Sequence, residues 1–395
     1  MTWMNKDKVL VIKNTKIYTE NKVMELASLV SVNGKITAVY EKQDVPADFP
    51  ANAVIIDGTG KSLIPGFIDG HIHGANGADV MDATETALDA IAGVLPKEGT
   101  TSFLATTITQ SKQEIEAALK NVAAYANKIG HAEVIGVHLE GPFIERSRAG
   151  AQPIEYIVDP NIELFKKWQL ASGDKIKTIT MAPEHDPDGR FIQYLIKNGV
   201  NVSAGHTKSG FSEMKQAVTY GVKQVTHICN AMSGIHHRDI GVVGAALQIP
   251  ELRAELIADT IHVSPEMMQL IYNTMGSKRL ILITDAMRAK CLNPGNYELG
   301  GQPVKVSADR ALLEDGTLAG SILKMNKAVQ NMLHLSHVAM EDIIEMASTN
   351  PAKQIGLYHM KGSIAVGKDA DLLLVDDGLT IHYTICRGSI GFKEE

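Results

Sequence analysis

The feature that most constrains this chain is a regular alternation of short apolar runs and helix-like stretches through its middle. Segments 113–126 and 211–219 are typical of the helical stretches that separate the runs. Strands that alternate with helices about eight times over roughly 290 residues predict an α/β protein with a (β/α)8 barrel of the TIM type. The alternative is an open doubly wound sheet, although no GxGxxG motif follows the first run. The runs are Ser62–Ile68, Thr101–Ala105, Val134–His138, Ile176–Met181, Val200–Ala204, Gln224–Ile228, Glu255–Ile257 and Leu280–Ile283.

The two ends of the chain have a different, strand-rich texture. Residues 28–40 carry strand-like segments on both sides of Asn33-Gly34, a dipeptide that favours hairpins because both turn residues take positive φ. Residues 371–375 and 380–386 form two further strand-like runs. We therefore predict a small β-sandwich domain made by both chain ends, residues 1–62 plus 355–395. It would accompany a barrel of residues 63–354.

The overall composition argues against several other kinds of protein. A net charge of −7 lacks the basic excess typical of nucleic-acid binding, and no apolar run approaches the roughly 18 residues that span a membrane. The three cysteines, Cys229, Cys291 and Cys386, form no CxxC pair, so neither a disulfide scaffold nor a thiolate zinc site is expected. The N-terminus lacks the pattern of a leader segment. We expect a cytoplasmic protein that binds neither nucleic acid nor membrane.

An HxH pair marks the end of the first predicted strand. His71 and His73 are two residues apart, so in a strand both imidazoles lie on the same side. The flanking Gly70 and Gly74 allow close approach of the backbone. Two neutral imidazoles side by side suit a divalent ion, although a lone HxH pair also occurs as ordinary polar or core histidines.

Four further strand ends carry an acid or an imidazole. Glu140 precedes a Gly-Pro breaker, Asp285 directly follows four apolar residues, and His206 and His227 lie at or just beyond two strand ends between them. Taken alone, Glu140 could be a surface carboxylate paired with Arg146 or Arg148. In a barrel, however, the carboxyl ends of all strands lie on one rim, so these groups converge with the HxH pair. The sequence thus predicts a metal centre in which Asp285 stays ionised and carries protons.

With these residues placed, the sequence resembles the amidohydrolase superfamily, and within it the N-acetylglucosamine-6-phosphate deacetylases. The resemblance covers nearly the whole chain. Many related barrels use a modified lysine as bridging ligand, whereas Glu140 takes that place here, as it does in the deacetylases. The motifs that carry the resemblance are PGFIDGHIHG, GTTSFLATTIT, HLEGPF, AGHT, THICNAM, HHRDIG, LITDAM, DGTLAGS and KGSIAVGKDADLLLVD.

The resemblance also implies how the metal centre divides. In this family the positions of Glu140, His206 and His227 hold a primary metal. Members that keep the HxH pair can bind a second ion through the positions of His71 and His73, and the pair is intact here. We therefore expect one or two divalent ions per subunit, which could be zinc, iron, manganese or cobalt because histidine and carboxylate ligands suit all four.

Substrate contacts are likewise implied by the resemblance. Arg238 and His262 would hold a sugar phosphate, since a guanidinium matches phosphate geometry. In family dimers this arginine reaches across from the partner subunit, which implies a homodimer; without the resemblance, Arg238 is an ordinary surface cation. The positions that match the family's contacts are Ala151, Gln152, Asn230, Ala231, Arg238, Asp259, Thr260, Ile261, His262, Leu318, Ala319 and Gly320.

Three positions depart from the family pattern. Thr260 stands where the family usually has glycine, which would alter the backbone beside the phosphate. Ile240 precedes Gly241 where proline is frequent, and Gln152 stands where some members have histidine. None of these departures affects an expected metal ligand.

The implied activity is hydrolysis of N-acetyl-D-glucosamine 6-phosphate to D-glucosamine 6-phosphate and acetate, in amino-sugar metabolism. A metal-activated water, deprotonated by Asp285, would attack the acetyl carbonyl, and Asp285 would then protonate the leaving amine. One alternative is an amidohydrolase acting on a cyclic amide or an N-acetyl amino acid. Another is a catalytically silent homologue that serves as a binding protein, although such proteins typically lose ligands and all six groups are present here.

Overall fold

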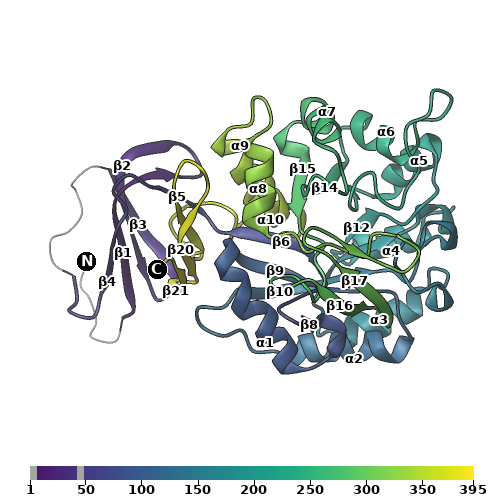
Figure 1. Ribbon diagram of the computed structural model, residues 1–395, viewed down its shortest axis with the longest axis horizontal. Helices are drawn as coiled ribbons and strands as arrows, with labels where there is room; N and C mark the ends of the chain where they lie inside the picture. Colours follow the sequence, from purple (N-terminus) through teal and green to yellow (C-terminus); the bar gives the residue numbers. More distant parts are fainter. Residues whose placement is uncertain (1–6, 42–48) are drawn as a thin grey trace.

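The larger part of the protein is a barrel of eight parallel strands, seen here in a computed structural model that describes residues 7–41 and 49–395 (Figure 1). The strand order follows the chain, and hydrogen bonds from Asp285 N to His71 O and from His73 N to Ala286 O join the last strand to the first. The predicted barrel is confirmed. Its strands are β6 (Phe67–Ile72), β9 (Thr100–Thr107), β10 (Glu133–Glu140), β11 (Ile176–Met181), β12 (Asn201–Ala204), β13 (Gln224–Val225), β14 (Arg253–Ile257) and β15 (Leu280–Ile283).

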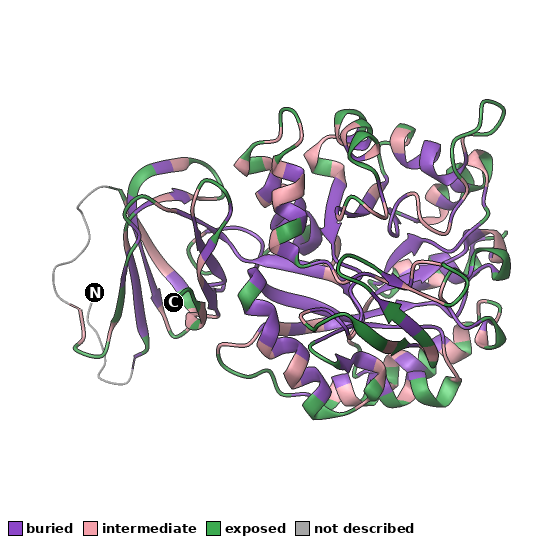
Figure 2. Ribbon diagram, viewed as in Figure 1, coloured by how far each residue is buried: buried purple, intermediate pink, exposed green. Residues whose placement is uncertain are grey.

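Most helices lie on the outside of this barrel, and Figure 2 shows that the strands are buried while exposed residues gather on the outer faces of the helices. In α2, Ser111 accepts a hydrogen bond from Glu114 N at the helix start, and the buried residues recur at helical spacing from Ile115 to Val122. No helix in the described part of the chain has the length and apolar character of a membrane span. The helices are α1 (Glu85–Val94), α2 (Lys112–Ala124), α3 (Ile162–Ala171), α4 (Arg190–Lys197), α5 (Phe211–Tyr220), α6 (Gly241–Gln248), α7 (Pro265–Met275), α8 (Met325–Leu333), α9 (Met340–Ile344) and α10 (Asn350–Gln354).

The first predicted strand is in fact two strands in different sheets. Ser62–Pro65 forms β5, which pairs with β1 and β19 outside the barrel, and Phe67 begins β6. Gly66 separates them, and a Cβ there would lie only 2.2 Å from the Thr101 side chain. Both halves of the run are buried, so apolar character alone could not separate them.

Both chain ends form the second sheet, with strand order β21-β20-β19-β5-β1-β2-β3 and β4 beside β1. The predicted hairpin turn is present, with φ of 50° at Asn33 and 84° at Gly34. Ile36 of β3 and Ile385 of β20, near opposite ends of this order, share one apolar core, so the sheet folds over itself. This confirms the small β-sandwich. Its strands are β1 (Val9–Tyr18), β2 (Val23–Val32), β3 (Lys35–Glu41), β4 (Val54–Asp57), β5, β19 (Leu372–Val375), β20 (Ile381–Cys386) and β21 (Ser389–Lys393).

The predicted domain bounds at residues 62 and 355 stay predictions, and residues 1–6 and 42–48 of the first segment lie outside the described residues. Two smaller sheets extend from the barrel. One joins β7 (Gly74–Ala75) to β8 (Ala78–Asp79). The other, which the sequence did not indicate, joins β16 (Gly295–Leu299), β17 (Gln302–Val306) and β18 (Ala311–Leu312), and it brings Leu299 to the cavity described next.

Candidate active site

The six groups predicted to converge do meet at the carboxyl end of the barrel strands. Glu140, His206 and His227 form a first trio: Glu140 Oε1 lies 3.3 Å from His206 Nε2 and 3.2 Å from His227 Nε2. The two imidazole nitrogens lie 3.1 Å from each other. This trio is buried, and its ligand atoms are close enough together to surround one ion.

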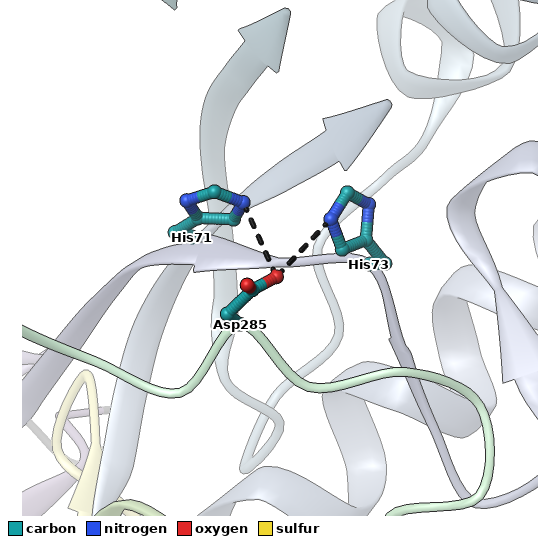
Figure 3. Close-up of side chains that lie close together, drawn as sticks. All are labelled: His71, His73 and Asp285. Atoms are coloured by element: carbon teal, nitrogen blue, oxygen red, sulfur yellow. Dashed lines mark ion pairs between the residues drawn. The ribbon is translucent and has the colours of Figure 1, made fainter. Parts of the chain in front are cut away.

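The HxH pair and Asp285 form a second trio beside the first (Figure 3). Asp285 Oδ1 lies 3.4 Å from His71 Nε2 and 3.3 Å from His73 Nε2. Glu140 reaches both histidines as well, with its two oxygens 3.3 Å from His71 Nε2 and 3.3 Å from His73 Nε2. Glu140, a member of the first trio, therefore also contacts both histidines of the second, so one carboxylate can serve both trios.

Unusual backbone conformations turn several of these side chains inward. His206, His227 and Asp285 have φ of 48°, 32° and 49°, in the left-handed region that residues with a Cβ rarely adopt. Each lies where a barrel strand has just ended. Such strained positions persist where the surrounding structure holds them in place, and they concentrate at functional sites.

The two carboxylates create a strongly negative potential at this site. Burial would lower the pKa of His73, but its contacts with Asp285 and Glu140 raise that pKa to about 9. Burial would likewise raise the pKa of Asp285, yet the nearby His71 and His73 lower it to about 2. The potential that favours protonated imidazoles also favours a divalent cation among them.

The hydrogen bonding of the imidazole nitrogens gives separate evidence that these residues could hold a metal ion. His71 Nε2 is buried and has no hydrogen-bond partner among the described residues, although it faces two carboxylates. His206 has its Nδ1 2.9 Å from the carbonyl of Arg148, which fixes the proton there and leaves Nε2 as a lone pair. His227 Nε2 lies 3.1 Å from that nitrogen and 3.2 Å from Glu140 Oε1, so the three atoms converge as the ligands of one cation would.

A cavity of about 300 Å³ opens above these groups. Arg148 is the one lysine or arginine among the described residues that line it. Seven of the predicted substrate contacts line the cavity: Ala151, Gln152, Asn230, Ala231, His262, Leu318 and Gly320.

Residues 62–391 match the model of the amidohydrolase family, which is well over half of the chain. This chain belongs to the amidohydrolase family. Among relatives, an N-acetylglucosamine-6-phosphate deacetylase of Bacillus subtilis is 46% identical over 392 residues, covering 97% of each chain. An N-acetylgalactosamine-6-phosphate deacetylase of Escherichia coli O157:H7 is 32% identical over 381 residues, covering 96% of this chain and 98% of the relative.

Solved amidohydrolase structures agree with this assignment. An N-acetylglucosamine-6-phosphate deacetylase from Pasteurella multocida superposes with a TM-score of 0.89 at 30% identity, over 97% of this chain and 99% of that one. A mutant of the Mycobacterium smegmatis deacetylase in complex with N-acetyl-D-glucosamine-6-phosphate superposes with a TM-score of 0.87 at 25% identity, over 98% and 100%. The protein is therefore a metal-dependent hydrolase of this family, and the site is its candidate active site.

The remaining predicted contacts lie outside the cavity lining. Asp259 accepts hydrogen bonds from the backbone of Ile261 and His262, and its Oδ2 lies 2.6 Å from His262 Nδ1. This contact turns Nε2 of His262 toward the cavity. Thr260 adopts a φ of 67°, the conformation for which glycine is the usual residue, so the departure from the family pattern leaves a strained backbone here. Ala319 is buried beneath the lining.

Arg238 lies away from the cavity within this chain. It is exposed on the loop after β13, where its Nη1 is 2.7 Å from His237 Nε2. The prediction placed Arg238 at the cavity of a partner subunit and not at that of its own chain. This placement leaves the predicted role across a subunit interface untested.

Two residues in the site were missed by the sequence reading. Arg148 was considered only as a surface partner for Glu140, and Glu255 was seen only as the start of a strand. Gln152, which was predicted, has a further contact: its Nε2 donates to Glu140 Oε2 at 2.6 Å while its oxygen accepts from Thr109 N at 2.7 Å. No local sequence signal marks Glu255, because its partner His71 is 184 residues away.

Proposed function

We propose that this amidohydrolase removes the acetyl group from N-acetyl-D-glucosamine 6-phosphate, giving D-glucosamine 6-phosphate and acetate. The observation that carries the proposal is the convergence of five metal-ligand candidates and Asp285 at the floor of a cavity that Arg148 and His262 also line. The names of the relatives that match nearly the full chain support the same substrate.

The divalent ion would be held first by Glu140, His206 and His227. His71 and His73 would hold a second ion, with Glu140 shared between the two. Zinc, iron, manganese and cobalt all suit imidazole and carboxylate ligands. When bound, such an ion lowers the pKa of water and polarises a carbonyl oxygen.

Asp285 would carry the proton. The nearby His71 and His73 hold its pKa below the ordinary value and keep it ionised at neutral pH, and an ionised carboxylate can accept a proton from the attacking water. The same carboxyl then gives the proton to the departing nitrogen, which is necessary because a free amide anion is a very poor leaving group. The Gln152 amide would hold Glu140 in place through its 2.6 Å hydrogen bond.

The phosphate would lie toward His262 and the guanidinium of Arg148. Arg238, which lies outside the cavity of its own chain, would reach the cavity of a second copy, so we propose a homodimer. The three cysteines are free thiols, which is consistent with action in the cytoplasm.

The test is acetate release from N-acetyl-D-glucosamine 6-phosphate by the metal-loaded protein, by the chelated protein and after metal is restored. Activity that disappears and returns supports the proposal. N-Acetyl-D-galactosamine 6-phosphate serves as the competing substrate, because a relative named for that sugar is 32% identical. An absence of acetate release from N-acetyl-D-glucosamine 6-phosphate by the metal-restored protein would overturn the proposed function.

Asp285→Asn tests the proton carrier separately. The amide keeps the shape of the side chain but cannot accept the proton, so we expect kcat to fall by about 100-fold to 10,000-fold. The first ion, counted per chain by mass spectrometry, should remain bound because Glu140, His206 and His227 are intact. A variant with near-normal kcat would remove Asp285 from the mechanism.

A further inference from the structure

Glu255 lies behind the HxH pair and has no part in the roles described so far. Its carboxylate is buried inside the barrel on β14, 2% exposed. Oε2 lies 3.1 Å from His71 Nδ1 and 3.4 Å from the backbone N–H of His227. An ionised carboxylate only accepts hydrogen bonds, so His71 carries its proton on Nδ1 and its Nε2 lone pair faces Glu140 and Asp285.

Three side-chain amides, joined by hydrogen bonds, hold Glu255 on the side that faces away from His71. The amides come from β13, β12 and α10, and the series of hydrogen bonds ends at Arg253, which opens β14. Each link is a hydrogen bond between side chains. Gln224 Nε2 donates to Glu255 Oε1 at 2.5 Å, Asn201 Nδ2 to Gln224 Oε1 at 2.9 Å, Gln354 Nε2 to Asn201 Oδ1 at 2.6 Å, and Arg253 Nη1 to Gln354 Oε1 at 2.7 Å.

The two charged ends determine the direction of every link. A guanidinium can only donate and a carboxylate can only accept, so each amide between them must turn its oxygen toward Arg253 and its nitrogen toward Glu255. Reversing any one amide would place two donors or two acceptors face to face. The orientation of Glu255 is therefore determined by groups far from the metal centre.

The other half of the HxH pair lacks such support. His73 Nδ1 is buried without a hydrogen-bond partner among the described residues, and so is His227 Nδ1. Of the two histidines proposed for the second ion, His71 is the one whose tautomer a buried carboxylate selects.

We propose that Glu255 is a positioning residue: it selects the Nδ1–H tautomer of His71 and thereby presents Nε2 to the second metal ion. The inference rests on the two-ion arrangement of the proposed function. Carboxylates that orient ligating histidines in this way typically change metal affinity by about 10-fold to 100-fold when they are removed.

Glu255→Gln changes the hydrogen-bond direction with almost no change in shape. If the new amide accepts from Gln224, its NH2 group faces His71 Nδ1. The imidazole must then carry its proton on Nε2, where the ion would bind. If the new amide turns over, two NH2 groups meet at Gln224. The first arrangement blocks the second ion's site. The second leaves Nε2 free but is disfavoured by the two facing NH2 groups, so the variant should bind the second ion more weakly.

Adding Gln224→Glu to this variant restores the direction. The carboxylate then lies one strand further back, on β13, where it still accepts from Asn201. The new amide at position 255 donates to that carboxylate, and the oxygen of the same amide accepts from His71 Nδ1. The double variant E255Q/Q224E thus exchanges the two groups between neighbouring strands. It should recover most of the metal affinity that E255Q loses.

The measurement is metal titration of the full-length, metal-free protein with Zn²⁺ or Co²⁺, with bound ions counted per chain after equilibrium dialysis. We expect wild type to bind two ions. E255Q should bind the second ion about 10-fold to 100-fold more weakly and the first within about 3-fold of wild type. Asn350→Ala is the matched control, because the side-chain amide of this buried α10 residue donates to carbonyls of residues 277 and 280, away from the metal centre.

Three results would overturn the inference: an unchanged second dissociation constant in E255Q, a double variant no better than E255Q, or a wild-type count of one ion. The last result would also remove the two-ion arrangement, whereas deacetylation is judged independently by acetate release. Thermal unfolding of each metal-free variant checks the fold. Should E255Q not fold, Gln224→Met is the second variant. It removes the amide that donates to Glu255 and is expected to weaken binding of the second ion but not of the first.

Discussion

Asp79 offers a quantitative test of how burial changes the pKa of a carboxyl group beside the metal centre, and with it the stability of the fold. Its side chain is 2% exposed at the start of a short 3-10 helix, where Oδ1 accepts from Met81 N at 2.9 Å. The other oxygen, Oδ2, has no hydrogen-bond partner among the described residues. Burial raises the pKa of Asp79 to about 6, although His73 and Arg288 act in the opposite direction.

The sign and size of the effect on stability follow from this shift. The folded protein holds the Asp79 proton up to about pH 6, whereas the unfolded chain loses it near pH 3.8. Between these values the native state binds more protons, so the free energy of unfolding falls as pH rises. At about 1.4 kcal/mol per pKa unit, Asp79 destabilises the fold by about 0.5 kcal/mol at pH 4 and about 3 kcal/mol at pH 7.5.

Asp79→Asn removes this dependence while its oxygen can still accept from Met81 N. We expect the variant to gain about 2.5 kcal/mol relative to wild type when pH is raised from 4 to 7.5. Urea unfolding of both metal-free proteins at the two pH values measures the double difference, from which other titrating groups cancel. Asp377→Asn is the control, because Asp377 is exposed in the turn between β19 and β20. A double difference near zero for Asp79→Asn would refute the reasoning.

Two further predictions concern charges. Lys290 Nζ lies 2.5 Å from Glu98 Oε1 with side chains 0% and 3% exposed, so Lys290→Met should leave a buried unpaired carboxylate and lower the free energy of unfolding by about 3–5 kcal/mol. Urea denaturation measures this, and a loss below about 1 kcal/mol would contradict it. Arg148→Ala should raise KM for the phosphorylated sugar by about 10-fold to 100-fold, and KM for the unphosphorylated sugar far less, as steady-state acetate release would show. Equal effects on both sugars would exclude a phosphate contact, and exposed Arg190→Ala controls for the loss of one charge.

The sequence predicted the barrel and the residues at its strand ends, because both follow from the order of strands and helices along the chain. Strand-like runs separated by helices predict parallel strands, and parallel strands place their carboxyl ends on one rim. That rule alone brought His71, Glu140, His227 and Asp285 together before any distance was known. The run Ser62–Ile68 shows the limit of this rule: two buried strands of different sheets have the same apolar character, so the break at Gly66 is visible only in the tertiary structure.

The substrate positions show a second limit. Their assignment came by resemblance, and the fold places His262 at the cavity but Arg238 on an exposed loop. Arg148 lines the cavity because the loop after β10 folds over it, with His206 bonded to the Arg148 carbonyl. No sequence pattern distinguishes such an arginine from any other loop cation.

By itself, the sequence determined the repeating architecture, the hairpin at Asn33-Gly34 and the identity of the groups at the strand ends. The resemblance implied that Glu140 bridges the two histidine sets, but only the tertiary structure showed that Glu255 contacts His71. The physical reason is range: periodicity and turn chemistry act over a few residues. The hydrogen bonds that orient the metal centre, by contrast, join strands far apart in the chain, and they form only when the barrel closes.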